Sequence, residues 1–394
     1  MDGDRSPTRR VYLDNAATTW PKPEAVYVAV ERYQRECGVA AGRGAYRDAL
    51  ETLRTVTAAR LGVARLLGAA DHRRVIWTHN CTDALNLALH GLLRAGEHVV
   101  TTDTEHNSVL RPLRWLSDER GVRVTSVPCD ATGAVNPCDV RRALRSDTRL
   151  VVINHASNVT GTVQPLAEIA RIVREHGARL LVDAAQTLGQ IPWDVDVNGP
   201  VLVAAAGHKS LLGPLGVGLL YVGPGLESEL LPTRQGGTGT HSEDDRQPAT
   251  LPDRYESGNL NVPGLVGLAA GVEFVRQRGV DAIAAHHQRL AESLRAGLRA
   301  IPGVAVFAPA AGTPAVGVVS CAVEGFEPQE VATILDAEYG VQVRAGLHCA
   351  PQIHRALGTF ARGGTVRLSV GCWTTDDDVD VALRAITAMA ELNA

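Results

Sequence analysis

Residues 201–209 read VLVAAAGHK, an apolar run followed directly by a glycine, a histidine and a lysine. A run without polar alternation is typical of a strand that is buried on both faces of a parallel sheet. A second such run, RLLVD at residues 179–183, ends on an aspartate. Because ligands bind at the carboxyl ends of strands in open α/β sheets, Lys209 and Asp183 are the first candidates for a functional site.

Similar runs continue on both sides of this stretch and alternate with segments of helical periodicity. They are residues 75–78, 98–102, 122–127, 150–153 and 217–221. We therefore expect an α/β fold with a mainly parallel seven-stranded sheet between helices.

The pattern changes past about residue 262. A long helical region is followed by short strands and by a last helix from about residue 376 to 392, which predicts a smaller α+β domain. We expect residues 1–20 to be an N-terminal arm that packs with this small domain, residues 21–262 to form a large domain, and residues 263–394 the small one. The polar, glycine-rich segment 233–253 is expected to cross to a partner or to line a site.

Composition and charge argue against several classes of protein. Lys+Arg number 39 against 43 Asp+Glu, so the chain lacks the basic surplus of a general nucleic-acid binder. No apolar run is long enough for a membrane span, and the polar start MDGDRSPTRR shows no targeting signal, so we expect a cytoplasmic protein. The seven cysteines are scattered without a CxxC pair, which predicts free thiols and no metal site.

Lysine is rare in this chain. Only Lys22 and Lys209 are lysines, and all other basic residues are arginine. A lysine between a buried strand and a glycine-rich turn can be desolvated, which lowers its pKa and makes the amine nucleophilic. The alternative for Lys209 is a solvated loop lysine, and Lys22, within WPKP, is expected to be such an ordinary loop residue.

Two further segments fit a pyridoxal 5'-phosphate (PLP) site. Asp183 would suit a protonated pyridine nitrogen, which needs a carboxylate partner, and the alternative is that it caps the following turn. Residues 78–83, THNCTD, lie between a predicted strand and a predicted helix. Free amides there and the Thr82 hydroxyl would bind a phosphate, and the alternative is a plain helix N-cap.

Two residues of the C-terminal part could act on a substrate. Cys349 lies in RAGLHCAP, residues 344–351, where Arg344 and His348 would favour its thiolate, while the other six cysteines are expected to be structural. Arg367 lies within an apolar strand, where a substrate carboxylate could pair with it. A salt bridge with an internal acid is the alternative.

Short motifs along nearly the whole chain carry a resemblance to one family. They are YLDNAATT at residues 12–19, RG at 43–44, TEHNS at 104–108, NHASNVTG at 154–161, DAAQ at 183–186, GHK at 207–209 and YESG at 255–258. In order and spacing the chain resembles the cysteine desulfurase and selenocysteine lyase family of class V (fold type I) PLP-dependent aminotransferases. The resemblance implies a large PLP-binding domain, a small domain that carries the nucleophilic cysteine, and a homodimer with its site near the subunit boundary.

The resemblance implies that a set of residues holds PLP: Cys81, Thr82, His106, Asp183, Gln186, His208, Lys209 and Asn259. Lys209 would attach the cofactor covalently, Asp183 would pair with the pyridine nitrogen, and Gln186 would reach the ring oxygen. His106 would stack on the ring and help to move protons. The others would hold the phosphate, Asn259 that of the partner subunit.

The resemblance also implies residues that act on the substrate. The amino acid would be bound by Ala17, Asn158, Arg344 and Arg367, with Asn158 and Arg367 on its carboxylate. Cys349 would be the nucleophile that accepts sulfur. The spacing from Arg344 to Cys349 resembles the branch with a short, ordered cysteine loop.

Three positions depart from the family pattern. Ala206 stands where a Ser or Thr near the phosphate is common, Asn259 where relatives carry a Thr, and Tyr46 where relatives often carry a His. Because the amide of Asn259 can still donate a hydrogen bond, cofactor binding is expected to survive. Tyr46 bears on the identity of the substrate.

The activity implied by the resemblance is that of a cysteine desulfurase. Such an enzyme converts L-cysteine to L-alanine and leaves the sulfur on Cys349 as a persulfide, for transfer to an acceptor protein or small thiol. The alternatives on the same scaffold are a C–S β-lyase, a selenocysteine lyase, and an aminotransferase or epimerase. A rival from another class is a catalytically silent scaffold that only binds a partner.

Overall fold

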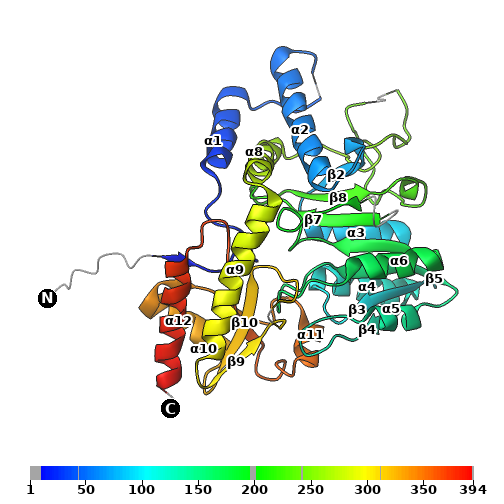
Figure 1. The fold of residues 1–394 in the computed structure, drawn as a ribbon. Coiled ribbons are helices and arrows are strands. Elements are labelled where there is room, and N and C mark those ends of the chain that lie inside the picture. Colours follow the sequence, from blue (N-terminus) through cyan, green and yellow to red (C-terminus); the bar gives the residue numbers. More distant parts are fainter. Residues whose placement is uncertain (1–9, 43, 196–200, 241–242, 311, 393–394) are drawn as a thin grey trace.

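A seven-stranded sheet and a four-stranded sheet, each with its helices, make up most of the molecule (Figure 1). The computed structural model describes residues 10–42, 44–195, 201–240, 243–310 and 312–392. The functional candidates come from both sheets, so the arrangement of the two decides which of them meet.

The seven-stranded sheet is mainly parallel, as expected. Its strands, in spatial order, are β2 (Val75–Thr78), β8 (Gly218–Val222), β7 (Val201–Ala206), β6 (Arg179–Asp183), β5 (Thr148–Asn154), β3 (His98–Thr102) and β4 (Arg123–Val127). Only β8 is antiparallel to its neighbours. In the centre of the sheet Asn154 and Asp183 are register partners, so β5 and β6 end side by side at the edge where ligands bind.

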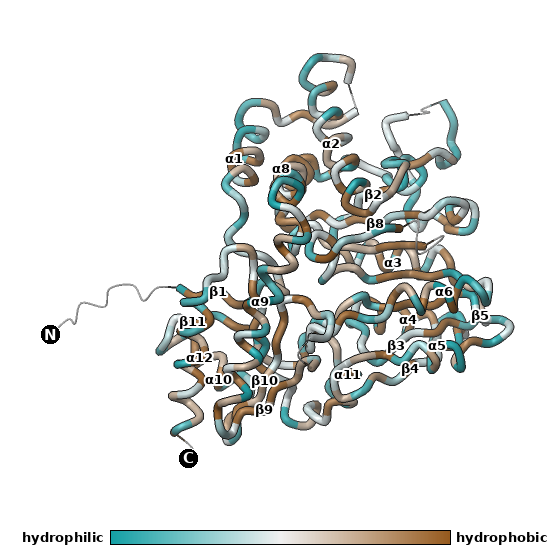
Figure 2. The backbone as a smooth tube through the Cα atoms, viewed as in Figure 1, coloured by the Kyte–Doolittle hydropathy of each residue, from teal (hydrophilic) through white to brown (hydrophobic). Residues whose placement is uncertain are grey.

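Helices cover both faces of this sheet because its strands are apolar on both. Val151 and Ile153 belong to one core, and Leu150 and Val152 belong to the other, as the two-residue period of a strand requires. The first core is closed by α2 (Arg47–Leu66), α5 (Pro137–Ala143), α6 (Leu166–His176) and α8 (Val262–Arg278). The second is closed by α3 (Cys81–Leu92) and α4 (Asn107–Arg120). Figure 2 shows hydrophobic backbone along these stacked strands and hydrophilic residues on the outer turns.

The four-stranded sheet is antiparallel and has the order β12 (Arg344–Gly346), β13 (Thr365–Ser369), β10 (Val318–Val323) and β9 (Val304–Phe307). An apolar core joins it to α9 (Val280–Arg299), α10 (Pro328–Tyr339) and α12 (Asp376–Glu391). The short helix α11 (Pro351–Ala356) follows Cys349 directly. The C-terminal part is therefore α+β, as its sequence pattern indicates.

The N-terminal segment runs along both sheets. β1 (Val11–Tyr12) pairs in parallel with β11 (Val341–Gln342), and Asp14 forms a bridge with Ser369 at the end of β13. Helix α1 (Glu24–Arg32) and the π-helix that follows it (Tyr33–Cys37) then pack against α8. The limits of the arm and of the two domains, at residues 20 and 262, stay a prediction.

Two features of the described residues concern the classes of protein that the sequence disfavours. No helix there is long and apolar enough to cross a membrane. No group of three or more His, Cys, Asp or Glu side chains in the same residues could hold a metal ion. The seven cysteines are free thiols.

Candidate active site

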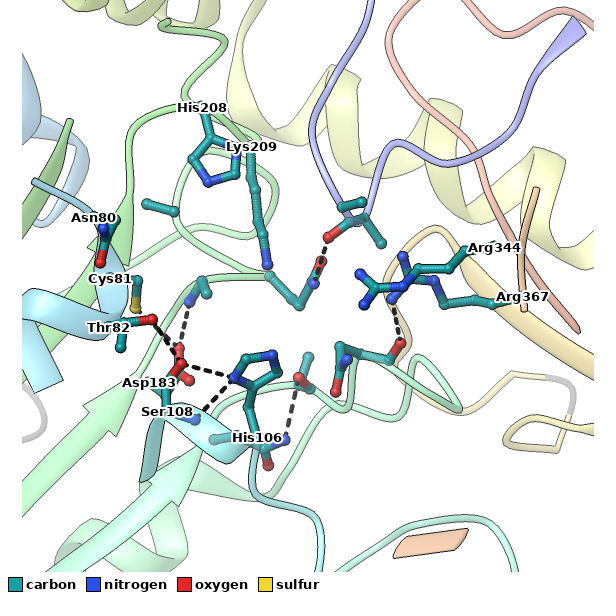
Figure 3. Close-up of a pocket in the computed structure, with 18 residues that line it drawn as sticks. Asn80, Cys81, Thr82, His106, Ser108, Asp183, His208, Lys209, Arg344 and Arg367 are labelled. Carbon is teal, nitrogen blue, oxygen red and sulfur yellow. Dashed lines mark hydrogen bonds between the residues drawn. The ribbon is translucent and has the colours of Figure 1, made fainter. Parts of the chain in front are cut away.

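A cavity of about 210 Å³ lies where the ends of the central strands face the second sheet (Figure 3). It is lined by all the residues predicted for the site except Cys349 and Asn259. Cys349 lies in an adjoining cavity of about 580 Å³, which shares Thr82 and His106 with the first. Asn259 lies in a different cavity of its own chain, so its predicted role toward a partner subunit stays a prediction.

Lys209 lies three residues past the end of β7, and its side chain points into the central cavity (Figure 3). The turn before it passes so close to β8 that a Cβ at Gly207 would lie 2.9 Å from the carbonyl oxygen of Val217. Burial lowers the pKa of Lys209 below its usual value, although Asp183 opposes this shift. A solvated loop lysine is therefore the wrong description of Lys209.

Lys22 is not the ordinary loop residue that its sequence context predicts. Its Nζ donates hydrogen bonds of 2.6 Å to Thr19 Oγ1 and to the carbonyl oxygen of His208. Burial lowers the pKa of Lys22 to about 8. The prediction is wrong because the partner His208 lies 186 residues away in the sequence.

Asp183, the last residue of β6, divides its carboxylate between two tasks. Oδ1 accepts the Ala185 N–H at 2.9 Å and the Cys81 thiol at 3.5 Å, so this oxygen caps the following turn. Within the described part of the chain Oδ2 makes no hydrogen bond and remains for a ligand. The neighbouring Gln186 donates through Nε2 to the carbonyl oxygen of Ala16 at 3.0 Å. The capping alternative therefore holds for Oδ1, and pairing of Asp183 with a pyridine nitrogen stays a prediction.

The start of α3 combines a helix N-cap with free amides. Asn80 Oδ1 accepts a backbone N–H of the first turn at 2.9 Å, so the plain N-cap is present. The amides of Cys81 and Thr82 have no acceptor within the helix, as is general for a first turn. Opposite, His208 Nδ1 is buried and has no partner among the described residues, and burial lowers the pKa of this ring to about 4. Ala206 lines the cavity without offering a hydroxyl.

His106 is held as a neutral ring with a known tautomer. Its Nδ1 accepts the Ser108 N–H at 3.0 Å, so the ring proton lies on Nε2. Ser108 Oγ lies 2.8 Å from the same Nδ1 and 2.7 Å from Thr82 Oγ1. Burial lowers the pKa of His106 to about 4. The sequence analysis did not select Ser108, although its place two residues after His106 at a predicted helix start is a usable signal.

Cys349 lies on a left-handed turn directly after β12. The φ angle is 48° at His348 and 58° at Cys349, a region that residues other than glycine rarely adopt. Two hydrogen bonds hold this turn: Asn158 Nδ2 donates to the His348 carbonyl at 2.8 Å, and Asn107 N–H donates to the Cys349 carbonyl at 2.7 Å. The structure therefore uses the Asn158 amide nitrogen for the turn and leaves its buried Oδ1 without a partner in the described residues.

The positive charge beside Cys349 comes from Arg344, whose Nη2 donates to Sγ at 3.4 Å. The expectation that His348 adds a second charge is wrong. Its ring is buried, Nε2 lies 3.0 Å from Thr365 Oγ1, and burial holds the pKa of His348 well below its usual range. A neutral histidine here fixes the turn but does not stabilise a thiolate.

Arg367 is paired internally and still has a donor left. Nη2 forms a 2.7 Å ion pair with Asp14 Oδ1, as the salt-bridge alternative predicts, and Nη1 donates to the Asn158 carbonyl at 3.1 Å. Its buried Nε has no partner among the described residues. Together with Arg344 and Ala17, Arg367 lines the central cavity, where a guanidinium group suits a substrate carboxylate.

The groups without partners in this cavity fit PLP. A free carboxylate oxygen on Asp183 matches a pyridine N–H, and the helix amides at Cys81 and Thr82 match a phosphate. The buried amine of Lys209 matches an aldehyde. A mainly parallel sheet with these groups at its strand ends defines the class of fold type I PLP-dependent enzymes.

Comparison with known families agrees with that class. The model of the family described as aminotransferase class-V matches residues 11–382, and the chain belongs to this family. Its members are PLP-dependent enzymes.

Individual relatives make the similarity more specific than the family does. A probable cysteine desulfurase from Methanothermobacter thermautotrophicus is 38% identical over 378 residues, which cover 94% of this chain and 92% of that protein. A probable cysteine desulfurase from Halalkalibacterium halodurans is 33% identical over 402 residues, which cover 99% and 96%. The apo structure of a cysteine desulfurase from Thermococcus onnurineus has a TM-score of 0.91 at 29% identity, over 97% of this chain and 95% of that one.

Proposed function

We propose that this protein is a PLP-dependent cysteine desulfurase that forms L-alanine from L-cysteine and holds the removed sulfur on Cys349. The observation that carries the proposal is the Cys349 turn. Its Sγ receives a hydrogen bond from Arg344, and its backbone is bonded to the segment that holds His106. A thiol placed beside an amino-acid cavity in this way is suited to accept sulfur from a bound substrate.

Different groups in the cavity bind the cofactor and the substrate. When bound, PLP supplies an electron sink that weakens the bonds around the substrate's α-carbon. Asp183 would keep a proton on the ring nitrogen, and the start of α3 together with His208 would hold the phosphate. The guanidinium groups of Arg344 and Arg367 bind the substrate carboxylate, which orients the amino acid with its sulfur toward Cys349.

Proton transfer falls to Lys209 and His106. Because burial lowers the pKa of Lys209, its amine is more readily neutral and takes the proton from the substrate's α-carbon. The neutral His106 ring can donate its Nε2–H to a group bound in the cavity. Because this ring is uncharged, it does not repel the proton on the pyridine nitrogen of the cofactor.

Sulfur transfer falls to Cys349. Its thiolate attacks the substrate sulfur, a sulfur–sulfur bond forms, and the carbon–sulfur bond breaks. The electron pair of the broken bond stays with the substrate carbon, and a proton completes the methyl group of alanine. The persulfide on Cys349 then passes its outer sulfur to a second thiol.

The test compares wild-type protein with Cys349→Ser after incubation with L-cysteine. We expect alanine and a persulfide in the wild type, and cofactor absorbance without alanine in the variant. Alanine formation at the wild-type rate by Cys349→Ser would overturn the proposed role. Pyruvate, ammonia and a free thiol as products would instead indicate a C–S β-lyase.

We further propose that the protein acts in the cytoplasm as a homodimer and gives its sulfur to an acceptor protein or small thiol. Asn259 lies away from the central cavity of its own chain, which is consistent with a role in a partner subunit's site. Tyr46 is exposed and also lies outside the central cavity of its own chain.

A further inference from the structure

Several donors converge on the carbonyl oxygen of His208, directly before Lys209. Thr18 Oγ1 and Thr19 Oγ1 each lie 3.2 Å from this oxygen, and the Thr19 backbone nitrogen lies 3.3 Å away. The Lys22 ammonium is closest, at 2.6 Å. A carbonyl oxygen has two lone pairs, so these donors compete, and the charged donor forms the strongest bond.

The hydroxyl of Thr19 links Lys22 to the carbonyl group of Lys209 itself. Thr19 Oγ1 accepts a hydrogen bond of 2.6 Å from Lys22 Nζ, which leaves its own proton free to be donated. The carbonyl oxygen of Lys209 lies 3.1 Å from this hydroxyl and can accept that proton. Lys22 therefore acts, directly and through Thr19, on the carbonyl groups before and after the Cα of Lys209.

The position of Lys22 makes its positive charge unfavourable in free energy. Its Nζ donates hydrogen bonds to two neutral oxygens, and no carboxylate of the described residues forms an ion pair with it. Removing a cation from water without a counter-ion costs free energy, which agrees with the lowered pKa of this group. The chain has only two lysines, and the side chain of one, Lys22, reaches the turn that carries the other.

We propose that Lys22 is a positioning residue for Lys209, fixing the backbone on both sides of the residue that carries the cofactor. The inference rests on the proposed role of Lys209. Lys22 does not line the central cavity, so it acts through the His208 carbonyl and the Thr19 hydroxyl and not on the substrate. Through Asp14, the same arm also holds Arg367, so residues 14–22 connect the cofactor side of the cavity with the carboxylate side.

The test uses full-length protein stripped of cofactor and reconstituted with PLP. Lys22→Met removes the charge and the donors but keeps the length of the side chain, whereas Lys22→Arg keeps a cation. We expect Lys22→Met to bind PLP about tenfold more weakly, the effect of losing one charge-assisted hydrogen bond, and Lys22→Arg to recover most of that loss. Thermal unfolding of the apoproteins shows whether each variant is folded.

Thr19→Val keeps the shape of the side chain and removes the bridging hydroxyl, and it decides the question if Lys22→Met does not fold. We expect it to weaken PLP binding about threefold, since a neutral hydrogen bond is lost. Wild-type affinity in a folded Lys22→Met, or in Thr19→Val if Lys22→Met is unfolded, would overturn the inference.

Borohydride reduction makes the bond between PLP and a lysine permanent, and peptide mass spectrometry then locates it. An adduct on Lys209 in the wild type, together with slower formation of the same adduct in Lys22→Met, supports the inference. An adduct on another residue of the wild type would refute the proposed role of Lys209. An adduct on Lys209 that forms equally fast in Lys22→Met would refute only the role of Lys22.

Discussion

The turn that carries Lys209 and the turn that carries Cys349 hold reactive side chains beside the same cavity in opposite ways. The first follows a central strand, and its backbone is packed so closely that a Cβ at Gly213 would lie 3.0 Å from the carbonyl oxygen of Gly207. The second follows an edge strand and is left-handed at two successive residues that are not glycine. Desolvation favours the neutral form of an amine, whereas a nearby cation favours a thiolate, which also needs access to an acceptor.

The surroundings of the two residues differ accordingly. Lys209 lines the central cavity, and burial is the main cause of its lowered pKa. Cys349 lines the larger outer cavity together with Arg111 and Trp115, and Trp115 is 46% exposed. The proposed chemistry would thus be divided between a more buried region, where Lys209 takes up a proton, and a more exposed region, where Cys349 receives sulfur.

The largest effects should come from removing the two reactive groups in turn. Lys209→Ala should abolish both cofactor attachment and alanine formation, whereas Cys349→Ala should abolish alanine formation alone, each by roughly 10³-fold or more. Absorbance spectra and chromatography of alanine measure the two properties. Loss of cofactor in Cys349→Ala would mean that the two regions do not act separately.

Removing the cation beside Cys349 should have the next largest effect. Arg344→Met deletes the hydrogen bond to Sγ, and we expect alkylation of Cys349 by iodoacetamide to slow by about tenfold. Arg111→Met is the matched control, because Arg111 lines the same outer cavity but makes no hydrogen bond to Sγ. Equal slowing in both variants would show that overall charge, not the Arg344 contact, activates the thiol.

A smaller effect is expected from Ser108, on the proton-transfer side. Ser108→Ala removes the hydroxyl between Thr82 and His106 but keeps the backbone N–H that fixes the His106 tautomer. We expect kcat to fall by about threefold, with Ser108→Thr close to wild type. A fall as large as that of His106→Ala would show that the hydroxyl, and not the amide, orients the ring.

The smallest effect concerns the stability of the Cys349 side. His354 is fully buried near His348, and burial lowers the pKa of His354 to about 4. The unfolded chain therefore binds more protons than the folded one between its ordinary value near 6.5 and about 4, so stability falls as the pH drops through this window. Urea unfolding at pH 6.5 and 5 should show a loss roughly 1.5 kcal/mol larger in wild type than in His354→Gln. Equal losses would mean that His354 is not the group that titrates.

The central sheet and the candidates at its strand ends could be predicted because both depend on local sequence. Runs such as residues 201–206 are apolar without alternation, and strands of this kind are buried on both faces. Lys209 and Asp183 follow from their places at the ends of such runs. The prediction that Thr82 lies at a helix start also depends on local sequence, since polar residues between a predicted strand and a predicted helix are typical of such a start.

The remaining features depend on contacts between distant segments, which local patterns do not contain. Asp14 pairs with Arg367 across 353 residues, and Lys22 reaches His208 across 186. The neutral state of His348 follows from burial by the second sheet, whereas its sequence neighbourhood suggests a cation. Local patterns do not reveal the hydrogen bond from Asn107 to Cys349 either, because it joins the start of α4 to the turn after β12 in the other sheet.

The most direct test of the account is peptide mass spectrometry of the protein after brief incubation with L-cysteine that carries a heavy sulfur isotope. We expect one additional heavy sulfur atom on the peptide that contains Cys349, together with an equal amount of alanine before any acceptor thiol is added. Alanine without labelled sulfur on Cys349, or label on another cysteine that persists in Cys349→Ser, would contradict it.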